Sequence, residues 1–376
     1  MKYKLSDICK YAKGKIKVSA LDDNTYISTE NMLPNKGGIT KAVSLPTQEQ
    51  TQAFMKNDVL VSNIRPYFKK IWYATFDGGC SNDVLVFRAK DGVSSRFLHY
   101  VLADDTFFDY SMATSKGTKM PRGDKKAIME YEVPELSYED QCRIAGILEV
   151  IDEKIELNTD INKNLEQQAK ALYKDWFFDF SPFSTEGNLP NGWRLGTVGD
   201  IIQLHDSKRV PLSGSERGKM KKIYPYYGAT SLMDYVDNYL FDGIYLLLGE
   251  DGTVVDSLGF PILQYIYGQF WVNNHAHIIT GKEGFSVEEL YLFFSLTNIK
   301  SIVTGAVQQK VSQQNLKKVP AIIPNKEALN AFDDLIQPIF AQIRNLKDEN
   351  IRLADLRDSL LPRLMSGELD VSNVEI

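Results

Sequence analysis

Cysteine is scarce in this sequence, since Cys9, Cys80 and Cys142 are the only three among 376 residues. They are far apart and form no CxxC pair, so neither a disulfide framework nor a cysteine zinc site is predicted. We interpret them as reduced thiols of a cytoplasmic protein. The sequence also lacks an apolar run long enough to cross a bilayer and a signal-peptide core near its start, so no membrane partner is expected.

The motifs of common catalytic sites are missing as well. There is no GxxxxGK[ST] phosphate loop, no HExxH zinc helix and no GxSxG elbow. No two of the 14 prolines are adjacent, which excludes the Asn-Pro-Pro or Asp-Pro-Pro string by which amino-methyltransferases hold a target base. No glycine-rich turn suits S-adenosylmethionine. We therefore predict no catalytic residue in this chain and no cofactor bound to it.

Two groups of side chains could hold a metal ion. His275 and His277 share one face of a predicted strand, but no cysteine or carboxylate stands beside them as a further ligand. The acidic candidates are Asp206, Glu250, Asp251 and Asp256. No lysine stands at a nuclease-like spacing from these acids. Hydrogen bonding to protein or DNA is the favoured role for both groups, and no metal site is predicted.

Two stretches carry a heptad pattern, which predicts long helices that face a partner. The first runs from about Gln141 to Phe178, and adding 188 to its seam positions gives the seam of the second. The seam residues are Ile144, Leu148, Ile151, Ile155, Asn162, Leu165 and Leu172 in the first helix, and Phe332, Ile336, Ile339, Ile343, Leu346, Asn350, Leu353 and Leu360 in the second. The matched Asn162 and Asn350 suggest that polar seam residues fix the register of the two helices. Two unrelated amphipathic helices are the alternative.

The repeat extends beyond the helices. The same shift of 188 takes Gly117 to Gly305, each in a polar loop upstream of a Val-Pro pair. Upstream, FLHYVLAD resembles YLFFSLTN, SNDVLVF resembles NNHAHII, and LSDI resembles VGDI. The chain is therefore predicted to be one unit written twice, a globular region followed by a long helix, with pseudo-twofold symmetry.

The local patterns predict an α+β fold for each globular region. In the first region, strands are expected at 14–23, 26–29, 58–64, 70–75 and 83–88, and a helix at 96–108. In the second, strands are expected at 201–204, at 242–248 and within 270–280, a helix at 287–296, and a long polar loop at 205–222. Pro338 and Pro362 should kink or end the second long helix, giving a short leading piece and a main helix that ends near Leu361.

Charge and loop chemistry favour a DNA-binding role. The net charge is −6, but the first 132 residues are net basic and the acidity is concentrated in the helical stretches. Arg and Lys suit guanine edges, Asn and Gln suit adenine edges, and other polar groups would hold phosphates. The candidates in the first region are Asn63, Arg65, Tyr67, Lys69, Lys70, Lys116, Thr118, Lys119 and Arg122. Those in the second are His205, Lys208, Arg209, Tyr226, Tyr227, Thr230, Asn273, Asn274, His275, Gln308, Gln309 and Lys310.

The chain resembles the specificity subunits of type I restriction–modification systems over nearly its whole length. The resemblance is carried by LVSNIRPYFKKIWYA and CSNDVLVF in the first half, and by PYYGATSLMDYVDNYLFDG, LLLGEDG and NNHAHII in the second. The joint LPNGW and the terminal LRDSLLPRLMSGELDVS add to it. The resemblance implies two target-recognition domains of mixed strands and helices, separated by two long helices packed antiparallel. Each domain would read half of a two-part site in double-stranded DNA.

The resemblance also implies partners and a domain plan. Two methyltransferase subunits and a translocating endonuclease subunit are expected, which would carry the S-adenosylmethionine, ATP and Mg chemistry. The expected boundaries are 1–132 and 194–318 for the recognition domains, 133–180 and 319–376 for the spacer helices with the tail, and 181–193 for the joint. The alternatives are a specificity subunit for a fused nuclease–methyltransferase, a self-sufficient nuclease or methyltransferase, and a coiled-coil adaptor with no DNA role.

Overall fold

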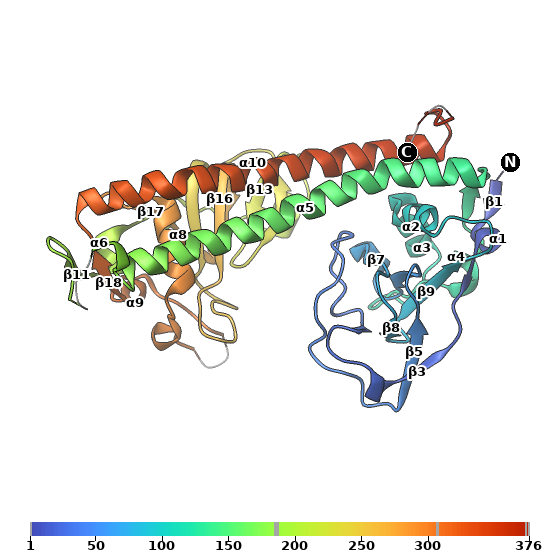
Figure 1. Cartoon of the computed structure of the whole chain (residues 1–376), viewed down its shortest axis with the longest axis horizontal. Helices are drawn as coiled ribbons and strands as arrows, with labels where there is room; N and C mark the ends of the chain where they lie inside the picture. The colour runs from blue at the N-terminus through green and yellow to red at the C-terminus, as the bar shows by residue number, and fades with distance from the viewer. Residues whose placement is uncertain (1, 184–187, 306–307, 373, 375–376) are drawn as a thin grey trace. The chain divides into compact units, whose positions relative to one another are not determined.

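The chain forms two compact units in the computed structural model, which describes residues 2–183, 188–305, 308–372 and 374. The first unit comprises residues 1–157 and 349–376, and the second comprises residues 158–348. Each unit contains a globular head and a stretch of both long helices, α5 (Tyr138–Phe177) and α10 (Lys326–Met365) (Figure 1). We call residues 2–137 the first head and residues 178–325 the second head.

The first head contains three small sheets. The strand order is β1-β10 in the first, β2-β9-β6-β7 in the second and β3-β5-β8-β4 in the third. The strands are β1 (Lys2–Lys4), β2 (Cys9–Tyr11), β3 (Lys15–Lys17), β4 (Tyr26–Ile27), β5 (Gln50–Phe54), β6 (Val59–Ser62), β7 (Ile71–Tyr73), β8 (Gly78–Cys80), β9 (Val84–Ala89) and β10 (Glu132–Pro134). The helices are α1 (Leu5–Ile8), α2 (Ser95–Ala103), α3 (Asp105–Ala113) and α4 (Lys125–Ile128), with 3-10 turns at η1 (Val18–Ala20) and η2 (Pro66–Phe68).

The second head contains a two-stranded sheet, β11-β18, and a six-stranded sheet with the order β12-β17-β15-β16-β13-β14. The strands are β11 (Arg194–Thr197), β12 (Ile202–Leu204), β13 (Tyr224–Tyr227), β14 (Leu232–Val236), β15 (Phe241–Gly249), β16 (Leu263–Val272), β17 (Ala276–Gly281) and β18 (Pro320–Ile323). The helices are α6 (Val198–Ile201), α7 (Gly214–Arg217), α8 (Val287–Leu296) and α9 (Gln313–Lys317), with turns at η3 (Ser181–Phe183), η4 (Asp206–Lys208) and η5 (Lys300–Ile302).

The two heads share a common plan, as the sequence repeat predicts. The order β2-β9-β6-β7 in the first head matches β12-β17-β15-β16 in the second, and both sets of four strands pair antiparallel. Both heads begin with a strand, a one-turn helix with a capping box, and a second strand. The heads differ in what adjoins the shared sheet, which is a separate four-stranded sheet in the first and strands β13 and β14 in the second.

The core of each unit includes apolar side chains from its own stretch of the long helices. In the first unit, Ile144 and Leu148 of α5 belong to the same cluster as Leu361 and Leu364 of α10 and the buried side of α2. In the second unit, Phe332 and the residues that follow it on α10 join the cluster of α8 and β17. Burying each large apolar side chain stabilises the fold by about 1.5–3 kcal/mol, so head and helices are held together within each unit.

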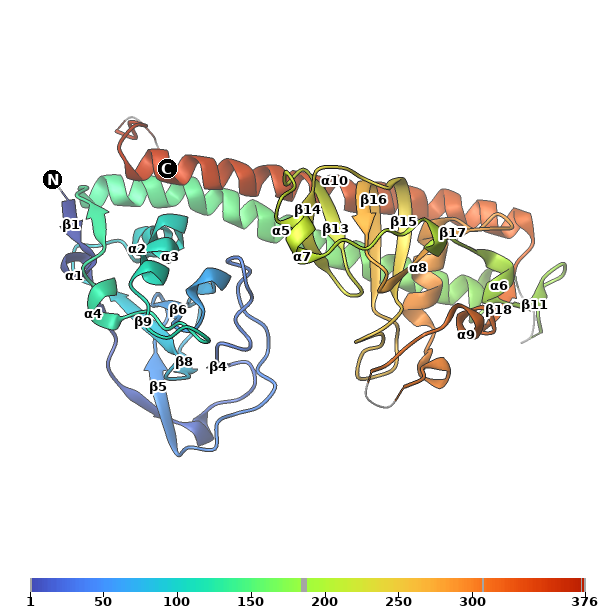
Figure 2. The ribbon, with the colours of Figure 1, turned by 180° about the vertical axis from the view of Figure 1, so that it is seen from behind.

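The long helices run antiparallel, and α10 continues through both of its prolines (Figures 1 and 2). The expected break at Pro338 and the end near Leu361 are therefore wrong, because α10 extends from Lys326 to Met365 without interruption. Interior proline costs a helix about 3 kcal/mol. Ile336 and Phe340, on either side of Pro338, are 0% and 1% exposed, and their burial offsets that cost.

Two further local predictions need correction. The helix expected at 96–108 is two helices, α2 and α3, because Asp104 has extended backbone and its Oδ1 accepts a hydrogen bond from the Thr106 N–H to cap α3. The strand expected at 14–23 is limited to β3, which η1 follows. The helix expected at 287–296 is observed as α8 with the same bounds. The boundaries predicted for the spacers and recognition domains stay predictions, since the two compact units divide both long helices midway.

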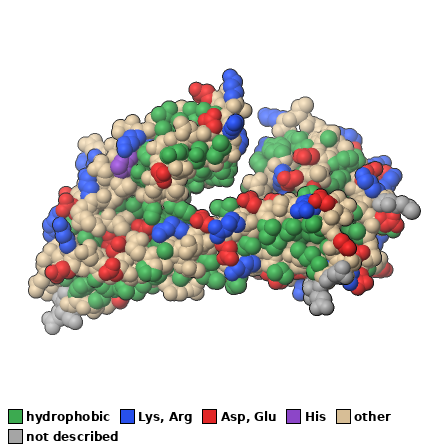
Figure 3. Space-filling view, turned by 90° about the horizontal axis from the view of Figure 1, so that it is seen from above, with side chains coloured by type: hydrophobic (Ala, Val, Ile, Leu, Met, Phe, Trp, Pro, Cys, Tyr) green, Lys and Arg blue, Asp and Glu red, His purple; other side chains and the backbone are tan. Residues whose placement is uncertain are grey.

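Some predicted features fall outside the described residues. The joint expected at 181–193 includes residues 184–187, the second glycine loop includes residues 306–307, and the C-terminal tail includes residues 373, 375 and 376. Within the described part of the chain, none of the helices combines the length and apolar character needed to cross a bilayer. Basic and acidic side chains are interspersed on the face shown in Figure 3.

Candidate nucleic-acid interface

A closed hairpin follows the helical segment of the first head. The N–H groups of Lys116 and Arg122 each donate to the carbonyl of the other, at 2.9 and 3.0 Å. Gly117 has φ +91°, a conformation that L side chains rarely adopt, and it allows the chain to turn directly after Lys116. The Arg65 N–H donates to the Pro121 carbonyl at 2.8 Å, which ties the hairpin to the segment after β6.

The second head contains the same hairpin. The N–H groups of Thr304 and Lys310 each donate to the carbonyl of the other, at 2.9 and 2.7 Å. Gly305 has φ +87°, and the Gly252 N–H donates to the Gln309 carbonyl at 3.0 Å. Every one of these positions except Gly252 is the first-head position shifted by 188 residues.

One cation stands at the same place in each hairpin. Arg122 pairs with Asp83 at 3.1 Å, and Lys310 pairs with Glu250 at 3.5 Å. About half of each cationic side chain remains exposed, 55% for Arg122 and 50% for Lys310. Each acid therefore holds a cation at the surface of its head without covering it.

The remaining candidates in the first hairpin lie at the surface. Lys116 pairs with Asp124 at 2.5 Å, and its side chain is 81% exposed. The hydrogen bond from Lys116, together with the N–H groups of Ala127 and Lys126, lowers the pKa of Asp124 to about 2. Thr118 and Lys119 are exposed. The hairpin thus presents a basic, hydroxyl-bearing edge to solvent.

The segment after β6 contributes one exposed aromatic group. Tyr67 is 48% exposed, and its ring contacts Phe68 with centroids 4.7 Å apart. Lys69 pairs with Asp105 at 2.8 Å. Tyr67 is placed to contact a ligand, whereas the ammonium group of Lys69 is engaged inside the head.

Three other first-head candidates are largely withdrawn from solvent. Asn63 is 8% exposed, and Arg65 is half-buried. The Nζ of Lys70 donates to the Thr29 carbonyl at 2.6 Å, and burial lowers the pKa of this lysine. This placement favours a role in the loop framework for all three.

In the second head, some candidates are exposed and others are internal. Lys208, Thr230, Asn274, Gln308 and Gln309 are exposed. His275 is also exposed, and its Nδ1 lies 2.5 Å from Asp251. These residues belong to four separate loops of the head.

The internal candidates have structural contacts. Tyr226 is 1% exposed, and its hydroxyl accepts from the Leu212 N–H at 3.0 Å. Tyr227 is half-buried beside Phe270. Asn273 is 5% exposed and its Oδ1 accepts from the His275 N–H at 2.8 Å. Their placement favours shaping of the loops over contact with a ligand.

His205, at the start of the same loop, is half-buried. Its Nε2 lies 2.8 Å from the Thr280 hydroxyl, and burial lowers its pKa. This histidine therefore joins the loop that follows β12 to β17 within the head.

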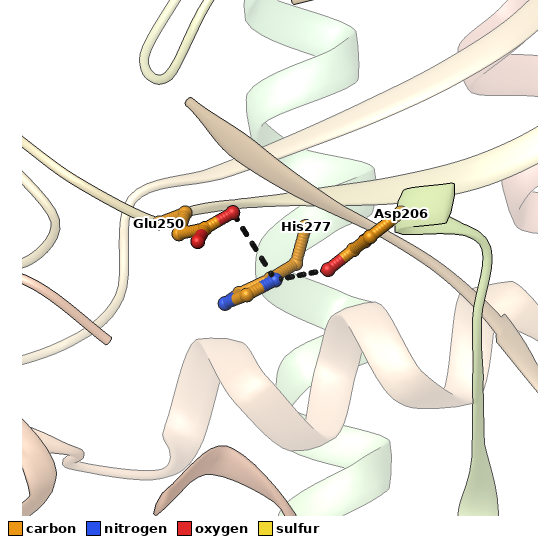
Figure 4. Close-up of side chains that lie close together, drawn as sticks. All are labelled: Asp206, Glu250 and His277. Carbon is orange, nitrogen blue, oxygen red and sulfur yellow. Dashed lines mark hydrogen bonds and ion pairs between the residues drawn. The ribbon is translucent and has the colours of Figure 1, made fainter. Parts of the chain in front are cut away.

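Arg209 belongs to a buried polar cluster with Asp206, Glu250 and His277 (Figure 4). Its Nη1 donates to Glu250 at 2.6 Å and to the Ala276 carbonyl at 2.7 Å. Only 13% of its side chain is exposed. The sequence predicted a DNA contact at Arg209, but this placement favours a structural role, in which the guanidinium links η4 to the ends of β15 and β17.

The same cluster has the composition of a metal site. Ligand atoms of Asp206, Glu250 and His277 lie within 4.8 Å of one another. His277 Nδ1 lies 2.6 Å from Asp206, its Nε2 lies 2.8 Å from the Val311 carbonyl, and Arg209 neutralises Glu250. Because these hydrogen bonds already use the ring nitrogens and an internal cation is present, the cluster does not fit a metal ion.

Burial raises the pKa of Asp206, but the hydrogen bonds that it accepts outweigh burial and leave its pKa below the ordinary value. The strongest of these contacts is with His277, and the Ile278 N–H donates to the same carboxylate at 2.9 Å. The carboxylate therefore stays ionised inside the head, where it joins η4, β17 and the start of α9 through Gln313.

The predicted helix seam is placed at the contact between α5 and α10. In the first unit, Ile144, Leu148 and Ile151 are buried, and Ile155, Asn350, Leu353 and Leu360 are half-buried. In the second unit, Asn162, Phe332, Ile336, Ile343 and Leu346 are buried, and Leu165, Leu172 and Ile339 are half-buried. None of these fifteen described residues is exposed.

Sequence reasoning missed the polar contacts that fasten each head to its helices. In the first unit, the Tyr100 hydroxyl donates to Asp152 at 2.8 Å, and Arg357 donates to the same carboxylate at 2.7 Å. In the second unit, Arg344 pairs with Glu288 at 3.1 Å, and the Tyr265 hydroxyl donates to Glu288 at 2.6 Å. Only Arg357 gave a signal in the sequence, as a polar residue at a seam position.

Known proteins with similar sequences and folds were found. A family model described as "Type I restriction modification DNA specificity domain" matches residues 1–167 and 190–353. The type I restriction enzyme MjaIX specificity subunit of Methanocaldococcus jannaschii is 27% identical, over 76% of this chain and 71% of that relative. The HindI specificity subunit of Haemophilus influenzae is 23% identical, over 98% of this chain and 99% of that relative.

One solved structure has a similar fold. The type I restriction–modification S subunit from M. genitalium aligns with a TM-score of 0.54 and 17% identity, and the match covers 97% of this chain and 96% of that one. At this level of identity, the likeness concerns the fold alone.

Proposed function

Since this chain belongs to the family of type I restriction–modification DNA specificity subunits, we propose that it reads a two-part DNA site with one half-site for each head. The observation that carries the proposal is the repetition of one head plan on one pair of helices. Two heads that share a framework but differ in their loops suit two half-sites of different sequence. The antiparallel helix pair sets the gap between the half-sites.

The exposed loop residues supply the contacts to DNA. Tyr67 and the exposed edge of the 116–122 hairpin serve the first head. Thr230 and Asn274 serve the second head together with Gln308 and Gln309. Amide side chains suit adenine edges, hydroxyls contact bases or phosphates, and an exposed aromatic ring can pack against a base or sugar.

The chemistry belongs to partner subunits. Two methyltransferase subunits bind the helix pair and its heads, and a translocating endonuclease subunit joins the complex for cleavage. S-adenosylmethionine, ATP and Mg are bound by those partners, and the complex works in the cytoplasm. This chain contributes recognition and assembly.

Methylation mapping tests the proposal. The chain is expressed with the methyltransferase subunit of its own operon in a host without DNA methylation, and the genome is sequenced by a method that detects modified bases. The expected result is one two-part motif with a fixed gap. Tyr67→Ala should relax only one half of that motif, and Asn274→Ala should relax only the other half.

Two results would contradict the proposal. If a stable complex formed and methylated DNA without a two-part motif, the division of the site between the heads would be wrong. If both substitutions relaxed the same half of the motif, the assignment of one half-site to each head would fail.

A further inference from the structure

The two hairpins are the most closely repeated part of the heads. Their main-chain hydrogen bonds, positive-φ glycines and exposed cations recur at positions 188 residues apart. Each hairpin is also followed at once by a capped helix, with Asp124 at the N-cap of α4 and Ser312 at the N-cap of α9.

The neighbouring surfaces are not repeated in this way. In the first head, Tyr67 lies in η2, and a separate four-stranded sheet adjoins the shared strands. In the second head, β13 and β14 extend the shared sheet, and Thr230 lies in the loop between them. Half-sites of different sequence have different base edges, whereas their sugar–phosphate backbones are chemically the same.

We infer that the two hairpins bind DNA phosphates, with Arg122 and Lys310 each neutralising one phosphate in its half-site. This inference rests on the proposed function. A feature kept alike in both heads contacts what the two half-sites have in common, and the surfaces that differ between the heads read the bases. Gln308 and Gln309 then help to hold the backbone and do not select adenine.

The chemistry of the matched position agrees with this assignment. Arg stands there in one head and Lys in the other, and a phosphate accepts either cation, whereas a bidentate contact to a base depends on side-chain geometry. Asp83 and Glu250 hold the two cations at the head surface, with about half of each side chain exposed. A phosphate oxygen can approach this exposed half without breaking the hairpin.

The test measures affinity against salt for the assembled complex on two duplexes, one with the mapped motif and one without it. Arg122→Gln and Lys310→Gln are each expected to weaken binding to both duplexes by roughly fivefold to tenfold at low salt. Each should also reduce the slope of log K against log salt by about 0.9, the value for one phosphate contact. The mapped motif should stay unchanged.

Two further variants sharpen the test. Lys282→Gln removes an exposed cation outside the hairpins and is expected to leave both affinity and slope unchanged. Arg122→Lys keeps the charge but changes the geometry of the donors. It should retain the salt slope and the motif if the ligand is a phosphate, and it should alter one base position if the ligand is guanine.

A changed base preference in the Arg122 or Lys310 variants would overturn the inference, as would a salt slope equal to that of the unchanged chain. Failure of the proposed function gives a different result. In that case the unchanged complex binds both duplexes equally, while a lower slope in the Gln variants still supports phosphate binding by the hairpins.

Discussion

Asn350 of α10 donates a hydrogen bond from its Nδ2 to the backbone carbonyl of Ile155 of α5, at 3.1 Å. This bond crosses the helix pair inside the first unit and connects a seam side chain to a fixed point on the partner backbone. A polar seam residue of this kind reduces stability but favours one register of the two helices. In the second unit, the Oδ1 of Asn162 is buried and has no hydrogen-bond partner among the described residues.

Replacing both seam asparagines by leucine is expected to raise stability and loosen register. Asn162→Leu removes a buried polar atom, which should stabilise the chain by about 1–2 kcal/mol. Asn350→Leu removes the cross-helix bond, so the double variant should tolerate more than one gap between half-sites. Thermal unfolding and methylation mapping measure the two effects. Unchanged stability together with an unchanged gap would contradict the register role.

Asp152 is expected to stabilise the first unit more than an exposed ion pair does. Asp152→Ala removes the acceptor of both Tyr100 and Arg357, whose donors lie partly buried. We expect a loss of about 1–3 kcal/mol in the free energy of unfolding. Lys154→Ala is the matched control, because Lys154 lies 3.8 Å from Glu349 in a more exposed pair and should cost about 0–1 kcal/mol. Equal losses in urea denaturation would contradict the prediction.

Glu289 should make the second unit less stable as pH rises. Burial raises its pKa to about 8, the Ser286 N–H opposes this, and the charges of Asp333 and Glu288 add to the rise. Between the ordinary pKa of 4.5 and about 8, the folded unit therefore keeps a proton that the unfolded chain has released. The stability from Glu289 is complete below pH 4.5 and is lost as pH rises through 8.

The variant Glu289→Gln tests this dependence, because the neutral amide does not titrate. Relative to the variant, the unchanged chain should lose about 1.4 kcal/mol per pH unit across this window. Melting temperatures from pH 5 to pH 9 measure the difference. A constant difference between the two proteins over that range would contradict the assigned pKa shift.

The two hairpin glycines should differ in their tolerance of a side chain. At Gly305, an added Cβ would lie 2.1 Å from the Gln308 carbonyl oxygen, whereas at Gly117 the nearest atom, the Met120 carbonyl oxygen, is 3.4 Å away. Both positions also have positive φ, which costs alanine roughly 1–2 kcal/mol. Gly305→Ala should therefore weaken DNA binding more than Gly117→Ala. Equal binding in a fluorescence titration would show that the hairpin geometry does not matter.

The sequence predicted the repeated architecture well because periodicity reports which face of a helix is buried. The seam positions that begin at Ile144 and Phe332 are determined by local spacing, and α5 and α10 both contain 40 residues. The break at Pro338 was predicted from a local rule and is wrong, because the burial of Ile336 and Phe340 depends on tertiary packing that the rule does not include.

The repeat needed the structure for its alignment. Both Val-Pro pairs follow a glycine loop, but they are not equivalent in the fold. Glu132 pairs with Lys4, just before α1, and Pro320 pairs with Thr197, just before α6. The equivalent residues are therefore Glu132 and Pro320, which preserve the shift of 188.

The site was harder to predict than the fold, because the environment of a loop side chain is set by distant residues. Arg209 has the composition expected for a DNA contact, yet Glu250, far along the chain, accepts its hydrogen bond inside the head. Tyr226 is buried against the segment that contains Leu212. Arg122 and Lys310 were identified as candidates, but only the main-chain contacts reveal that they occupy matching positions.

The central claim is that the helix pair sets the gap between two half-sites, and a paired insertion tests it most directly. One heptad is added between Leu157 and Asn158 in α5 and another between Asp348 and Glu349 in α10, so that the seam pattern is preserved in both helices. Seven residues add about 10.5 Å, or about three base pairs at 3.4 Å each. Methylation mapping of this variant should give the same two half-sites with a gap about three base pairs longer. The same half-sites with an unchanged gap would contradict the claim.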